Sequence, residues 1–344
     1  MATGTYSIEQ LIEVNHLSAV EFGLDTIADT LRADVAAHNE IVSQNLSDMC
    51  AVTTDRRRIY GASQDGEMTE VDEFGKAQTV LPVHGADTEY PLRKFQRNVG
   101  WTNDWLATHT PADMALAVEG AKKAHLVNTT TQIKRALFMP ANYSYVDQFD
   151  DLSTLSVKRM VNADGDPIPD GPNGETFDGS THTHYTANAT LTATVATALV
   201  DNVVEHGFGT VRLAIARANE AAWRALTGFE AYTDSRLSMV DGDPVKRLNY
   251  SRIDNRPIGI YGAAEVWVKP WVPAGYATVF SVEGMNKPLV FREHPTFKGL
   301  RIVAANPDYP LYVQFMESYM GVGAWTRTAA ACLDFTNASY TSPF

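Results

Sequence analysis

The stretch 110–138 constrains the fold most, because it predicts one long helix against which the rest of the chain must pack. It opens with Thr110, Pro111 and Asp113, which supply a cap residue, a residue suited to the first helical position, and an acid in the first turn. Small and apolar residues then recur at helical spacing on one side: Met114, Ala117, Val118, Ala121 and Ala124. The segment is therefore expected to form an amphipathic helix.

The end of this helix is less clearly marked than its start. Residues 129–131 are three threonines, and β-branched residues lose rotamer freedom in a helix. The helix therefore either ends near Val127 or is carried through to Leu137 by packing. Pro140 ends it in both cases.

Residues 7–48 form a second helical pattern, and it is acidic. Residues 1–50 carry eight acids against the single Arg32. An amphipathic segment of this kind is expected to lie along another surface, its own or a neighbour's. Glu13 and His16 match a Glu-x-x-His metal pair, but a di-iron site needs a second pair, so a solvated helix face is favoured.

Residues 53–101 have few apolar residues and many Gly and Asp turn signals, which predicts an extended two-stranded hairpin arm. Because an isolated hairpin is marginally stable, this arm should rest on something else. The triplet Arg56, Arg57 and Arg58 could bind phosphate. Seven basic residues stand among eight acids in this stretch, so salt bridges to neighbours are the favoured interpretation.

The remainder of the chain has mostly strand patterns. The exceptions are a predicted helix at 190–205, closed by Gly207, and another at 219–229. Val211–Ile215 is expected to be a buried strand, 312–319 is ambiguous by period, and Trp267 and Trp271 are predicted core or interface aromatics.

Charge and composition exclude several classes of protein. The net charge is −13, which argues against a groove that grips nucleic acid, because such grooves are basic. No apolar run is long enough to span a membrane, and the N-terminus lacks a secretory-signal pattern. Cys50 and Cys332 are too few for a disulfide framework or a zinc cage.

Candidate sites for chemistry are weak. Asp164, Asp166, Asp170 and Glu175 fall at calcium-loop positions, but Pro169 replaces the central glycine, so a calcium site is disfavoured. His182 and His184 would share a strand face and could hold a metal, although a polar surface pair is favoured.

Other motifs are equally incomplete. Gly207-Phe208-Gly209 is an incomplete dinucleotide turn, and Gly75-Lys76 is no Walker loop. The pair Glu293 and His294 precedes a turn proline, where a structural role is favoured over acid–base chemistry. We therefore predict a protein that is not an enzyme, and assign no catalytic, cofactor-binding or metal-ligating residue and no cofactor.

Two segments carry a family resemblance. They are 258–276, which includes Ile258-Gly259-Ile260-Tyr261-Gly262, and 291–331, which includes Phe291-Arg292-Glu293-His294-Pro295 and Gly321-Val322-Gly323-Ala324-Trp325. Together with the order of elements, they resemble the major capsid proteins of tailed bacteriophages with the HK97 fold. The resemblance implies an α+β fold with an N-terminal arm (1–52), an extended β-hairpin loop (53–101), a peripheral domain with a spine helix (102–189 and 286–344) and an axial domain (190–285).

The same resemblance implies a structural protein that assembles with itself into hexamers and pentamers of an icosahedral phage head enclosing double-stranded DNA. Scaffolding, portal and decoration proteins would be its partners, and DNA would lie nearby without sequence-specific binding or any membrane contact. The protein would be located in the virion capsid and assemble in the host bacterial cytoplasm. Some family members crosslink a loop lysine to an asparagine. Lys76 lies in a comparable region, but no partner is matched.

Two other interpretations remain open at this point. An encapsulin-like compartment shell would share the fold but enclose no genome. A soluble α+β ligand-binding protein or enzyme would use the loops near 164–184, and would be a discrete monomer or small oligomer. Deletion of 61–84 is expected to spare the subunit's fold but abolish shells if the hairpin arm spans to neighbouring subunits.

Overall fold

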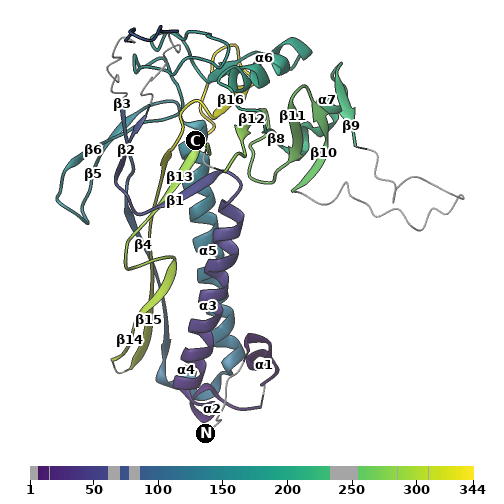
Figure 1. Ribbon diagram of the computed structural model, residues 1–344. Coiled ribbons are helices and arrows are strands. Elements are labelled where there is room, and N and C mark those ends of the chain that lie inside the picture. The colour runs from purple at the N-terminus through teal and green to yellow at the C-terminus, as the bar shows by residue number, and fades with distance from the viewer. Residues whose placement is uncertain are drawn as a thin grey trace, which may run out of the picture.

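The computed structural model describes residues 7–14, 16–60, 70–76, 86–232, 255–284, 286–308 and 310–344. Two long helices, α3 and α5, lie side by side along the length of an elongated molecule, and a narrow sheet runs beside them (Figure 1). A second sheet lies at one end, away from the N-terminus.

The helices are α1 (Ile8–Glu13), α2 (Ala19–Phe22), α3 (Leu24–Leu46), α4 (Asn103–Thr108), α5 (Pro111–Phe138), α6 (Ala193–Val204), the 3-10 turn η1 (Arg217–Asn219) and α7 (Glu220–Arg224). The strands of the first half are β1 (Cys50–Thr53), β2 (Arg57–Tyr60), β3 (Ala86–Glu89), β4 (Arg93–Thr102), β5 (Tyr143–Val146), β6 (Thr154–Val157) and β7 (Tyr185–Ala187). Those of the second half are β8 (Val211–Ile215), β9 (Phe229–Ala231), β10 (Arg256–Tyr261), β11 (Ala264–Val268), β12 (Tyr276–Ser281), β13 (Leu289–Glu293), β14 (Leu300–Asp308), β15 (Leu311–Ala324) and β16 (Ala330–Asp334).

The long helix α5 begins as predicted and runs through the threonine run to Phe138. Thr110 donates from its backbone N–H and its hydroxyl to the Asp113 carboxylate, both at 3.0 Å, and Pro111 is the first helical residue. The hydroxyls of Thr130 and Thr131 donate to backbone carbonyls one turn back, at 2.8 Å each. Buried Thr129 packs against Met320 of β15, so tertiary packing offsets the low helical propensity of this run.

The acidic N-terminal segment lies along α5, which confirms that it covers another surface of the same chain. Gly23, with a φ of 116°, separates α2 from α3 in a conformation that favours glycine. Ile27, Leu31 and Val35 of α3 are buried in a cluster with residues of α5 that include Val118 and Ala121. Lys122 of α5 forms a half-buried ion pair with Asp34 of α3 at 2.7 Å.

A histidine pair joins the same two helices and predicts a pH dependence. His38 Nε2 lies 3.1 Å from His125 Nδ1, and His125 Nε2 lies 3.2 Å from the Ser318 hydroxyl. Burial, and to a lesser extent the neighbouring His38, lowers the pKa of His125 from 6.5 to about 4. Burial also lowers the pKa of His38.

Because these pKa values are lowered on folding, the unfolded chain binds more protons between pH 6.5 and about 4. The free energy of unfolding should therefore fall as the pH falls below 6.5, with His125 contributing about 1.4 kcal/mol per pH unit. Urea unfolding of the protein at several pH values measures this. The variant His125→Gln should show a shallower pH dependence, and an unchanged slope would contradict the assignment.

The narrow sheet has the order β1-β13-β15-β14, and β4 pairs with β15 as well. The strand β15 is therefore the centre of a long antiparallel ribbon, paired with β4 from Leu311 to Met320. The ambiguous period at 312–319 thus belongs to a strand. A side chain at Gly321 would overlap the carbonyl oxygen of Pro91, so this close crossing of the hairpin arm over β15 requires glycine.

The second sheet has the order β7-β16-β12-β8-β11-β10-β9, and α6 packs on it. Val211–Ile215 is the predicted buried strand, and Trp223 beside it is fully buried. The C-terminal strand β16 lies between β12 and β7, so the last strand of the chain is inserted into a sheet built from its middle part. The helix expected at 219–229 is wrong in length: α7 covers only Glu220–Arg224, and 229 onward pairs with β10 as β9.

The base of the predicted hairpin arm is confirmed, since β2 and β3 pair antiparallel from Arg57 opposite Glu89 to Tyr60 opposite Ala86. The expected tip at 61–69 and 77–85 lies outside the described residues. The last part of the expected arm, β4, instead belongs to the β15 ribbon.

Candidate functional site

The predicted salt bridges anchor the hairpin arm to the body of the subunit. Arg56 lies 2.8 Å from Asp151 and 3.2 Å from Asp150, in the turn between β5 and β6. Arg58 instead lies over the Trp325 ring, 4.2 Å from its centroid. The salt-bridge interpretation is confirmed for Arg56, and the cation–π contact of Arg58 was not foreseen.

The carboxylates considered for calcium serve an ion-pair network. Asp164 and Asp166 both contact Arg327 and Lys158 at distances from 2.5 to 3.2 Å. Burial alone would raise the pKa of Asp164. The positive charge of Arg327 and hydrogen bonds from Arg327, Asn142 and Lys158 instead lower this pKa to about 2. Glu175 accepts hydrogen bonds from Asn173, away from this network. The calcium-loop pattern therefore reflects a structural ion network, as the missing central glycine suggested.

The histidines at 182 and 184 are not a surface pair. His184 is fully buried, and His182 retains only 18% side-chain exposure. Both converge on His206, which follows α6, with Nε2 atoms 3.1–3.2 Å apart. The sequence pattern missed His206, because residues some twenty positions apart meet only when α6 packs on β16, the strand that pairs with β7.

Among the described residues, this is the single group of three or more His, Cys, Asp or Glu side chains close enough to share a metal ion. The candidate pair Glu13 and His16 does not lie on one helix, because α1 ends at Glu13. Both side chains are exposed, which suits the favoured solvated face.

His294 stabilises a turn. Its Nδ1 accepts hydrogen bonds from the backbone N–H groups of Thr296 and Phe297, both at 3.1 Å, and its ring stacks on that of Phe297. Burial raises the pKa of the adjacent Glu293. With its Nδ1 occupied in this way, His294 has a structural role in the loop between β13 and β14.

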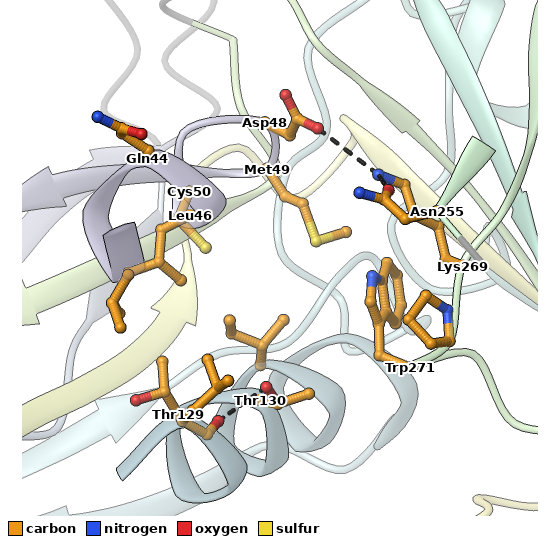
Figure 2. Close-up of a pocket in the computed structure, with 14 residues that line it drawn as sticks. Gln44, Leu46, Asp48, Met49, Cys50, Thr129, Thr130, Asn255, Lys269 and Trp271 are labelled. Atoms are coloured by element: carbon orange, nitrogen blue, oxygen red, sulfur yellow. Dashed lines mark hydrogen bonds and ion pairs between the residues drawn. The ribbon is translucent and has the colours of Figure 1, made fainter. Parts of the chain in front are cut away.

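A pocket of about 310 Å³ lies where the end of α3, the middle of α5 and the turn after β11 meet. Figure 2 shows Asp48 paired with Lys269 across it, at 3.7 Å, with Trp271 on the same side. Lys269 also donates to Asn255 at 2.7 Å. Burial raises the pKa of the Cys50 thiol at the pocket edge to about 12, so that thiol is not a nucleophile.

The outer face of α5 carries apolar side chains that the subunit itself does not cover. Leu116 is 65% exposed and Val127 is 59% exposed. They are eleven positions apart in the sequence, which is close to three helical turns, so they lie on one face. Other exposed apolar residues on the helical layer are Ile12, Val20, Ile41 and Leu126. A strip of this kind is typical of a surface that another protein covers.

No helix among the described residues is long and apolar enough to cross a membrane. Both cysteines are buried and free, in agreement with the absence of a disulfide framework.

No protein-family model matches the sequence, and no curated protein is similar to it. Among solved structures, a chain from Mycobacterium phage Patience matches with a TM-score of 0.68 at 20% identity, over 100% of this chain and 96% of that chain. A chain from the capsid of a native GTA particle matches with a TM-score of 0.48 at 14% identity, over 85% of this chain and 90% of that chain. A chain from an encapsulin complex of Synechococcus elongatus matches with a TM-score of 0.42 at 11% identity, over 89% and 91% respectively.

The similarity to the Mycobacterium phage chain extends over the whole sequence, so the two chains share one fold. In chain order, the helices α1 to α3, the paired strands β2 and β3 and the long helix α5 precede most strands of the second sheet. The chain therefore has an α+β HK97-like fold, which it shares with the Mycobacterium phage chain.

Proposed function

We propose that this protein is a major capsid protein, which assembles with itself into the hexamers and pentamers of an icosahedral phage head around double-stranded DNA. The observation that carries the proposal is the full-length structural similarity to the Mycobacterium phage chain. Sedimentation of the purified protein tests it, because an assembled shell and a 37.8 kDa monomer differ enormously in mass.

The architecture supports this proposal, because parts of the chain have little core of their own and would be covered by neighbouring subunits. Figure 1 shows a long, narrow molecule with the β5–β6 hairpin projecting from one side of it. The base of the arm, β2 and β3, is a two-stranded sheet, and such a sheet is marginally stable by itself. In a closed lattice, the contacts between subunits supply stability that the single chain lacks.

We assign residues 1–52 to the N-terminal arm and 53–101 to the extended loop. Residues 102–189 and 286–344 form the peripheral domain with the spine helix α5, and 190–285 form the axial domain. Strands β7 and β16 fall within the residues assigned to the peripheral domain, but they pair in the sheet that contains β8, β10, β11 and β12 and so join the two domains.

The role is structural rather than catalytic, and copies of the same chain are the principal partners. Scaffolding, portal and decoration proteins are further partners of such a subunit. A net charge of −13 suits a surface that lies near packaged DNA without holding it. We place the protein in the virion capsid, with assembly in the cytoplasm of a host bacterium.

Charged substitutions on the exposed apolar face of α5 are expected to impair assembly. Replacing both Leu116 and Val127 with Asp should raise the concentration needed for assembly at least about tenfold, because each contact would bury an unpaired carboxylate. Sedimentation across a concentration series measures the change. The matched variant Leu116→Met with Val127→Ile keeps the face apolar and should assemble like the wild type.

The same double Asp variant should leave the isolated subunit's free energy of unfolding within about 0.5 kcal/mol of wild type, since both side chains are already exposed. Normal assembly of a correctly folded double variant would show that this face is not a contact between subunits.

A further inference from the structure

Three imidazole nitrogens converge on one point beside strand β16 of the second sheet and the end of α6. The Nε2 atoms of His182 and His184 are 3.1 Å apart, those of His182 and His206 are 3.2 Å apart, and those of His184 and His206 are 3.1 Å apart. His182 and His184 both precede β7, whereas His206 lies in the turn after α6. Two segments of the fold therefore present three nitrogen atoms to a common centre.

The tautomer of His184 is fixed by its other ring nitrogen. Its Nδ1 lies 2.7 Å from the carbonyl oxygen of Ala330 in β16. A carbonyl can only accept, so Nδ1 carries the proton and Nε2 of neutral His184 presents a lone pair to the centre. A hydrogen bond of this kind on the outer nitrogen is the usual arrangement for a metal-binding histidine.

Hydrogen bonds alone do not account for the cluster. With Nε2 of His184 unprotonated, neutral His182 and His206 can supply at most two donor protons for three close contacts. At least one of the three nitrogen–nitrogen contacts is then not a hydrogen bond. A positive ion at the centre would accept all three lone pairs at once.

An aromatic ring packs against the cluster. The Phe177 ring covers the outer side, 4.1 Å from the His206 ring and 4.9 Å from the His182 ring. Among the described atoms, Nδ1 of His206 is buried without a hydrogen-bond partner, whereas its Nε2 contacts the two other imidazoles.

We propose that His182, His184 and His206 bind a divalent transition-metal ion, with Zn²⁺ as the first candidate. Imidazole is a preferred ligand of zinc, with a usual Zn–N distance of about 2.0–2.1 Å. Three nitrogens 3.1–3.2 Å apart are all reached at that distance from a point about 1 Å out of their plane. The three histidines thus form one face of a coordination sphere.

Glu205 is the candidate for a fourth ligand. Its Oε1 lies 3.7 Å from Nε2 of His182, and it precedes His206 in the chain. The positive charge of Arg327 is also nearby, but Asp164 and Asp166 neutralise it. The surroundings therefore tolerate an additional cation.

The ion would act as a structural crosslink. It would fasten the strand segment at 182–184 to the end of α6, where Asn202 already donates to the carbonyl of Thr183 at 3.1 Å. These segments join the two assigned domains, so the metal would stiffen their junction. A bound ion that favours the folded state raises its stability according to its concentration and affinity.

The test uses the full chain without a histidine tag, stripped of metal with a chelator and then titrated with ZnCl₂. Wild type should retain about one zinc per chain after dialysis, and its unfolding temperature should rise with zinc. His182→Gln and His206→Gln should each weaken zinc binding by at least about tenfold. His16→Gln, at an exposed site, is the matched control and should bind like the wild type.

Two further measurements keep the outcome unambiguous. X-ray absorption at the zinc edge should show about three imidazole nitrogens at about 2.0–2.1 Å. Circular dichroism confirms that each variant is folded, and the less buried His182 provides a usable variant if His206→Gln does not fold. The proposal is overturned if wild type retains no zinc, or if folded His182→Gln binds as tightly as wild type. Neither result bears on shell assembly.

Discussion

Replacing Arg327 with Met should destabilise the unassembled subunit by about 3–5 kcal/mol, because it leaves buried charges and carbonyls without their partner. The side chain is 1% exposed. Its guanidinium donates to the carbonyl of Arg159 at 2.7 Å, to Asn162 at 3.0 Å and to Asp164 at 2.8 Å. It therefore fastens the loop after β6 to the turn before β16.

Urea unfolding of the unassembled subunit gives the loss in free energy, with an unchanged denaturant slope as the sign that two-state unfolding is preserved. Arg32→Met is the matched control. It removes an arginine from an ion pair with Asp29 in which both side chains are more than half exposed, and such pairs contribute about 0–1 kcal/mol. Equal effects of the two substitutions would contradict the assigned role of Arg327.

Breaking the pair of Arg292 and Asp147 should have a similarly large effect, about 3–5 kcal/mol for Arg292→Met. The two side chains are 6% and 0% exposed and lie 2.8 Å apart. Arg292 also donates to the carbonyl of Tyr90 at 2.8 Å, so one guanidinium joins β13, the β5–β6 turn and the base of the hairpin arm. Its loss should loosen the attachment of that arm.

A double-mutant cycle separates the pair from its surroundings. Arg292→Met leaves a buried carboxylate unpaired, and Asp147→Leu leaves a buried guanidinium unpaired, whereas the double variant leaves neither. The double variant should therefore be less destabilised than the sum of the single variants by about 1–3 kcal/mol. Strict additivity would show that the two charges do not interact.

Local signals in the sequence were enough to locate α5 and the α3 segment. The cap at Thr110 and the 3.6-residue period of α5 depend only on residues that are close in sequence. The same is true of the turn at Gly207 that follows α6. Whether the threonine run at 129–131 is helical could not be predicted in this way, because it depends on packing against Met320 of β15, far along the chain. The short α7 has the same cause: pairing of β9 with β10 competes with helix formation.

The candidate sites show the same division. The two histidines at 182 and 184 were visible as a pair, but burial of His184 and the approach of His206 arise only when α6 packs on the second sheet. The partners of Arg327 and Arg292 are 145 or more residues away in sequence. No local pattern distinguishes such arginines from exposed ones, so the sequence disfavoured a calcium loop at 164–175 but could not show the ion network that Asp164 and Asp166 form.

Electron microscopy of the purified full-length protein, together with its sedimentation profile, tests the proposed capsid function most directly. The account predicts closed shells tens of nanometres across, or rings of five and six subunits. Packaged double-stranded DNA in particles from infected cells would further distinguish a phage head from a compartment shell. A monomer or dimer at every concentration, with no shells or rings in the images, would contradict the account.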